Sequence, residues 1–83
     1  MADAKHTPAQ HAAAHMAECR HQRHSTAVQS RKVWRGLVGV GFGWHPDANA
    51  ARQQMRESIR AARLYRRGQK HYAAIAKTTG SAA

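Results

Sequence analysis

The clearest pattern of apolar and polar positions lies in the second half of the chain, where apolar residues recur every three or four positions. On a helical wheel they fall within an arc of about 120°, as in an amphipathic helix. They are Ala48, Ala51, Met55, Ile59, Ala62 and Tyr65. Pro46 suits the first helical position and Asp47 suits the positive end of a helix. We therefore predict a helix from about Asp47 to Arg67.

The end of this helix has two interpretations. Gly68 ends it if the glycine acts as a C-terminal signal. Alternatively, the helix continues to Lys77, because further residues extend the apolar line. These residues are Leu64, Tyr72 and Ile75. The small and polar residues 78–83 are predicted to be disordered.

The first half of the chain begins with a helix-start signal and continues with many alanines. The residues that suit a capping box are Thr7, Pro8 and Gln10. Alanine has the highest helix propensity, so we predict a helix from about Pro8 to about Arg35, preceded by disorder at 1–6. The apolar pattern is weak here, and we expect any break at Ser25 and Thr26.

Residues 36–46 between the two predicted helices form a glycine-rich apolar connector. Large apolar residues alternate with glycine, so an extended chain would carry them on one face. Each glycine would cost a helix roughly 1 kcal/mol. We predict an extended or irregular segment whose aromatic residues pack in the small core. In the alternative, these side chains bind a partner, and the partner-binding residues are then Trp34, Val38, Val40, Phe42 and Trp44.

These elements predict an all-α protein that forms a single small unit over residues 1–83. It has two main helices, with or without a third short one, joined by the connector. A chain of 83 residues buries only about 60 to 65 per cent of the surface of its unfolded form, so the core is expected to be marginal. The one cysteine, Cys19, cannot form an internal disulfide.

The formal net charge is +10, and arginine outnumbers lysine by ten to four. This excess favours association with nucleic acid, an anionic membrane or an acidic protein. The planar guanidinium group suits bidentate contact with phosphate. A codon bias toward arginine and alanine would be an alternative cause of the composition.

Five arginines follow one line of the second predicted helix, beside the apolar arc. They are Arg52, Arg56, Arg60, Arg63 and Arg67. We predict that they bind nucleic-acid phosphates, without reading base sequence. The alternative is a solvated helix face that contributes only solubility. Arg66 departs from the line, because the wheel places it in the apolar arc near Ala48.

The run from Ile59 to Ser81 resembles the opening of resolvase-type helix-turn-helix domains over about 20 residues. In that family a helix ending ARxLxxxG precedes xxIAxxxGxS. The corresponding residues are Ala62, Arg63, Tyr65 and Gly68, then Ile75, Ala76, Gly80 and Ser81. The resemblance implies two helices separated by a turn. The chain ends two residues after Ser81, so we expect no recognition helix and no reading of the major groove.

Other chemistry is weakly indicated. His11, His15 and Cys19 follow a helical spacing and could share a metal, but no fourth ligand is apparent, so we predict no metal and no cofactor. The glycine-rich connector matches neither a dinucleotide-binding motif nor a P-loop. The four carboxylates are not paired at a useful spacing, and we do not expect an enzyme.

We therefore expect a small basic protein that binds nucleic acid, as a component of a larger assembly such as a virion or a nucleoprotein complex. Its composition is similar to that of small internal virion proteins of tailed phages. The alternatives are a protein that docks on an acidic protein surface, and a peripheral membrane binder. A protein partner or a homo-oligomer is expected. The N-terminus lacks the apolar segment of a secretory signal, so we expect a cytoplasmic or virion location and no secretion.

Overall fold

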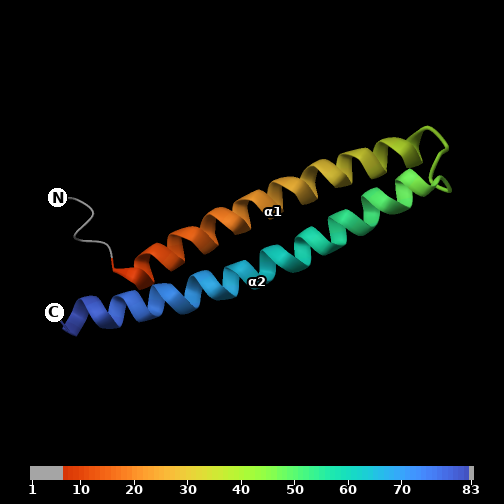
Figure 1. Cartoon of the computed structure of the whole chain (residues 1–83). Helices are drawn as coiled ribbons and strands as arrows, with labels where there is room; N and C mark the ends of the chain where they lie inside the picture. The colour runs from red at the N-terminus through yellow and green to blue at the C-terminus, as the bar shows by residue number, and fades with distance from the viewer. Residues whose placement is uncertain (1–6, 83) are drawn as a thin grey trace.

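The computed structural model describes residues 7–82, which form a hairpin of two long antiparallel helices (Figure 1). Helix α1 spans Pro8–Gly39 and helix α2 spans Pro46–Ala82, and the two pack against each other along the hairpin. The prediction of an all-α fold with two main helices is confirmed. No third helix occurs between residues 7 and 82.

Helix α1 begins with the predicted capping box. The Thr7 hydroxyl accepts a hydrogen bond from the Gln10 amide at 3.2 Å, and the Gln10 side chain accepts one from the Thr7 amide at 2.9 Å. The helix does not break at Ser25 and Thr26, where a break was expected. The Thr26 hydroxyl instead donates to the carbonyl of Gln22 at 3.1 Å, a local bond that leaves the helix intact.

The end of α1 differs from the predicted extended connector, because residues up to Gly39 are helical. The helix ends in a Schellman motif, in which the Phe42 amide donates to the Leu37 carbonyl at 2.7 Å and the Gly41 amide donates to Val38 at 3.1 Å. Gly41 has a φ of 89°, which a residue with a Cβ rarely adopts. The connector is therefore a compact turn, and the alternating face predicted for residues 38–44 does not form.

Helix α2 begins at Pro46, and the His45 imidazole Nδ1 accepts a hydrogen bond from the Asp47 amide at 3.1 Å. It runs through Gly68 to Ala82, so the helix ends neither at Arg67 nor at Lys77. The structure has a helix, and not the predicted disordered tail, for residues 78–82. Residues 1–6 and Ala83 lie outside the described part of the chain.

The two helices implied by the resolvase-type resemblance are one uninterrupted helix in this protein. Gly68 lies inside α2, and a Cβ built on it would be 3.1 Å from the Met16 sulfur of α1. The glycine therefore provides a close approach between the helices and not a turn. Between residues 7 and 82, neither helix has the length and apolar character needed to cross a bilayer.

The helices pack along a seam that repeats every seven residues, the pattern of two helices in coiled-coil contact. Buried or half-buried positions of α2 follow spacings of three and four: Ala48, Ala51, Met55, Ser58, Ala62, Tyr65, Gln69, Tyr72 and Ala76. The same spacings in α1 select Ala9, Ala13, Met16, Arg20, Arg23, Ala27, Ser30, Trp34 and Leu37. Only Arg20 and Arg23 among these seam residues are exposed.

The core is as marginal as the length predicts, because its most buried side chains are small. They are Ala27, Ser30, Ala48, Ala51 and Ser58. Ile59, which the wheel placed in the apolar arc, is 38% exposed, while its neighbour Ser58 is 1% exposed. The seven-residue repeat advances about 103° per residue in place of 100°, which moves the buried line from Ile59 to Ser58.

Candidate nucleic-acid interface

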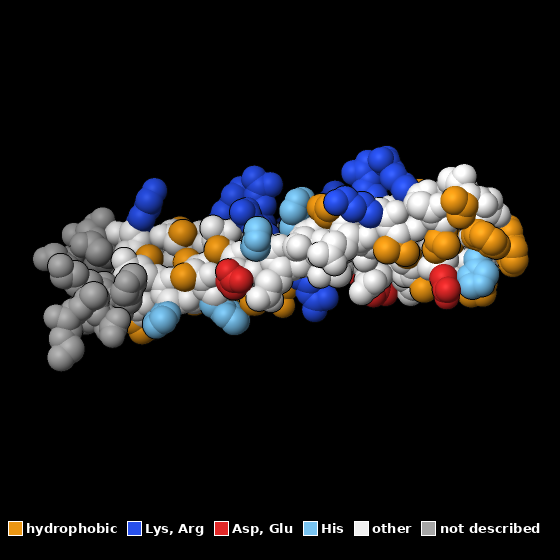
Figure 2. All heavy atoms as spheres, turned by 90° about the horizontal axis from the view of Figure 1, so that it is seen from above, with side chains coloured by type: hydrophobic (Ala, Val, Ile, Leu, Met, Phe, Trp, Pro, Cys, Tyr) orange, Lys and Arg blue, Asp and Glu red, His pale blue; other side chains and the backbone are white. Residues whose placement is uncertain are grey.

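The seam divides the hairpin into two broad faces of different charge. On one side, every seventh residue of α2 from position 56 to position 77 is basic. This side, called the basic face below, carries Arg20, His21, His24, Arg31 and Arg35 of α1 and Arg52, Arg56, Arg63, Arg66, Lys70 and Lys77 of α2. Figure 2 shows Lys and Arg side chains gathered mainly along one long edge of the molecule. A polyanion would meet many positive charges there.

A cavity of about 360 Å³ lies on the basic face near the middle of the hairpin. Its polar lining comes from both helices and consists of Arg20, His21 and His24 of α1 and Arg63 and Arg66 of α2. The remaining lining residues are Ala27, Ile59 and Ala62. No carboxylate lines the cavity, so its cationic groups have no acidic neighbour within it.

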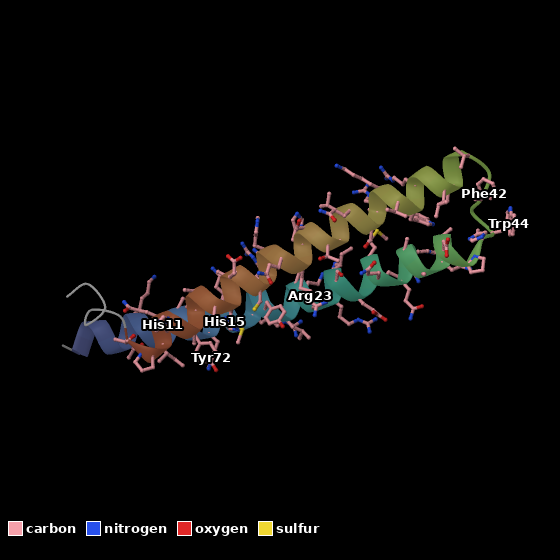
Figure 3. All side chains as sticks on the ribbon, turned by 45° about the horizontal axis from the view of Figure 1, so that its top comes forward. His11, His15, Arg23, Phe42, Trp44 and Tyr72 are labelled. Carbon is pink, nitrogen blue, oxygen red and sulfur yellow. The ribbon has the colours of Figure 1, made fainter. Side chains whose placement is uncertain are left out.

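The seam explains why a cavity forms at this level. Arg20 and Arg23 occupy seam positions, but they are exposed, because burying an unpaired guanidinium group would cost far more than packing returns. Arg23 lies at mid-length of the hairpin in Figure 3. Apart from Arg20, the seam residues that line the cavity are the small Ala27 and Ala62.

All five arginines of the predicted line are exposed, but they have different surroundings in the structure. Arg56, Arg60 and Arg63 line a second, shallower hollow of about 370 Å³ together with Ile59. The guanidinium carbon of Arg52 lies 5.7 Å from the centre of the Trp34 ring, a cation–π contact between the helices. Arg67 lines neither hollow.

Arg66 does not enter the core near Ala48, as the wheel suggested. It is exposed and lines the central cavity opposite Arg20 of the other helix. Sequence analysis also missed Arg20, His21 and His24, because it treated each helix alone. The signal that could have found them is the seven-residue seam, which indicates which flanks of the two helices share a face.

The predicted partner-binding residues gather toward the tip of the hairpin, and the expectation that the aromatic ones form the core is wrong for the turn. Trp44 is 72% exposed, and Phe42, Val38 and Val40 are exposed as well. Phe42 and Trp44 have ring centres 6.1 Å apart, and they lie together at the tip (Figure 3). Trp34 alone is half-buried, against Arg52.

The histidines near the start of α1 lie at the opposite end of the molecule. His11, His15 and Tyr72 are close to the pole where α1 begins and α2 ends (Figure 3). The Cys19 sulfur is 3.6 Å from Nε2 of His15. Within residues 7–82, no three His, Cys, Asp or Glu side chains form a group able to hold a metal.

These features cannot be interpreted through relatives: no family model, no curated protein and no solved structure matches the chain.

Proposed function

We propose that the protein binds nucleic acid through the basic face, by contacts to phosphates that do not depend on base sequence. The observation that supports this most directly is the central cavity, where three guanidinium groups and two imidazoles from both helices converge without a carboxylate. Guanidinium groups bind phosphate oxygens in pairs of parallel hydrogen bonds. A cluster of them without acidic partners favours a polyanionic ligand.

The length of the basic face also suits a nucleic acid. Arg52 and Lys77 lie roughly 38 Å apart along α2, at about 1.5 Å per residue. That distance is close to one turn of B-DNA, roughly 34 to 36 Å. Several phosphates of one duplex face could therefore contact the rod together. We place this activity in a larger nucleoprotein assembly, such as a virion, because the thin core favours a hairpin that is held by partners.

The test is the salt dependence of binding to duplex DNA, to RNA and to anionic vesicles, measured by fluorescence anisotropy or co-sedimentation. Substituting Arg63→Gln, Arg66→Gln or Arg20→Gln should each reduce the log–log salt slope on duplex DNA by about 0.9, because each removes one phosphate contact. A triple variant should reduce it by about 2.7 and weaken binding equally for unrelated sequences.

The matched control is Lys32→Gln, which removes one positive charge from a different surface. Lys32 lies midway between the seam residues Ser30 and Trp34, so it points away from α2, and it lines neither of the two hollows on the basic side. Its salt slope should match that of the unchanged protein. If Lys32→Gln and Arg63→Gln changed the salt slope equally, the result would contradict a defined basic face. If the protein bound vesicles but neither DNA nor RNA, its ligand would be a membrane surface and not nucleic acid.

A further inference from the structure

Between residues 7 and 82, no further element covers the face opposite the basic face. This surface, called the neutral face below, is represented by Gln22, Thr26 and Val33 of α1 and by Gln54 and Leu64 of α2. Val33 is 55% exposed and Leu64 is 59% exposed. A shallow hollow of about 200 Å³ lies between the helices there, beside the hydrogen bond from the Ser30 hydroxyl to the Gln54 side chain at 3.1 Å.

The hairpin by itself buries little that would hold two long helices together. Between residues 7 and 78, no side chain larger than that of Ser58 is fully buried, and the other well-buried residues are alanines and a serine. Small side chains remove little apolar area from water. A domain normally buries its apolar faces between packed layers, and among the described residues Val33 and Leu64 remain exposed with no second layer over them.

Charge decides which face can take that second layer. Two basic faces repel each other, whereas the neutral face is bordered by one arginine, the exposed seam residue Arg23, and Glu57 lies on the same side. The described acidic residues Glu18, Asp47 and Glu57 also lie off the basic face. A second copy of the chain therefore meets less charge repulsion against the neutral face than against the basic face.

The size of the face is sufficient for a stable dimer. The molecule measures 60 × 23 × 14 Å, so its broad side offers roughly 60 by 23 Å. A standard interface needs about 800 Å² per partner, which is less than this footprint. An interface between identical faces is also the commonest form of protein oligomer.

We propose that two copies associate through their neutral faces into a four-helix bundle, with the two basic faces on opposite outer surfaces. Val33 and Leu64 of each copy then pack against the same face of the other copy. The proposal does not depend on nucleic-acid binding, and it is tested in the absence of nucleic acid.

The first measurement is sedimentation equilibrium of the full chain from about 1 to about 100 µM. The expected mass is twice the 9.2 kDa of one chain. The melting temperature should rise with protein concentration, because folding and association are linked. A folded monomer at about 100 µM, a melting temperature independent of concentration, or a trimer or larger species would each overturn the proposal.

The second measurement assigns the face. Val33→Glu and Leu64→Glu should shift the protein toward monomer or unfolded chain, with at least a tenfold weaker association. Val28→Glu is the control, since Val28 is also an exposed valine of α1 but lies on the basic side of the seam. It should leave the dimer intact. If Val33→Glu only unfolds the chain, the concentration series of the unchanged protein still tests whether a dimer forms. A dimer that is disrupted by Val28→Glu but not by Val33→Glu or Leu64→Glu would overturn the assignment of the neutral face.

Discussion

At the scale of a single residue, Gln69 is an unfavourable feature in the packing of the hairpin. It occupies a seam position of α2, and its side-chain oxygen is buried without a hydrogen-bond partner. An unpaired buried acceptor usually costs about 1 to 3 kcal/mol. A polar seam residue can also fix the register of two helices. Replacing Gln69 by an apolar residue should therefore raise stability but weaken the preference for one register.

Gln69→Leu should therefore raise the free energy of unfolding by about 1 kcal/mol, because it removes the unpaired acceptor and adds apolar contact. Urea unfolding followed by circular dichroism measures this change. The control is Gln53→Leu, at an exposed position, where the glutamine side chain donates to Glu57 at 3.2 Å; its effect should be below about 0.5 kcal/mol. Destabilisation by Gln69→Leu would show that Gln69 makes a contact in the protein in solution.

The sequence predicts some residues of the seam and misses others for one physical reason. Ala48, Ala51 and Met55 fit both a straight helix and a seven-residue repeat, and these were placed correctly. Ile59 was chosen in place of Ser58, since hydrophobicity alone favours isoleucine. A close contact between two helices requires small side chains, so the serine is buried and the isoleucine remains at the edge.

At the scale of an element, the end of α1 shows tertiary contact overriding local propensity. Glycine spacing predicted an extended segment, yet Gly36 and Gly39 are helical and Gly41 makes the turn. Packing of Leu37 along the seam continues the helix despite the glycines, because most helical stability in proteins comes from such packing. The capping box, by contrast, is a local signal and was predicted correctly.

Gly36→Ala should stabilise the protein by about 0.5 to 1 kcal/mol, because glycine is unfavourable inside a helix. A Cβ at this position would meet nothing within 4 Å. Thermal unfolding provides the measurement. Gly41→Ala is the matched comparison: it also has open space, but its φ of 89° should make the same substitution destabilising by about 1 kcal/mol. Similar effects of both changes would argue against the Schellman motif.

At the scale of the whole molecule, the sequence predicts the helices and the excess of positive charge, but not the basic face. That face depends on how the flanks of α1 and α2 are brought together, and spacing within one helix does not determine this. Arg20 and Arg66 are distant in sequence but line one cavity. The nucleic-acid function remains a proposal, whereas the arrangement of the positive groups is now defined.

The length of the basic face predicts a minimum length of duplex. Affinity should rise steeply with duplex length up to about 11 base pairs, since roughly 38 Å of helix spans that many steps of about 3.4 Å. For longer duplexes, the affinity should increase only in proportion to the number of overlapping binding sites. Anisotropy titrations with duplexes from about 6 to about 24 base pairs test this. Full affinity for the shortest duplex would limit the site to the central cavity.

The antiparallel hairpin also gives the molecule two distinct poles. The start of α1 and the end of α2 lie at one pole, and Phe42 and Trp44 lie at the other (Figures 1 and 3). With a longest dimension of 60 Å, a linkage made near either end of the chain would leave the aromatic rings unobstructed. An attachment at one pole would therefore hold the other pole at a distance set by the length of the rod.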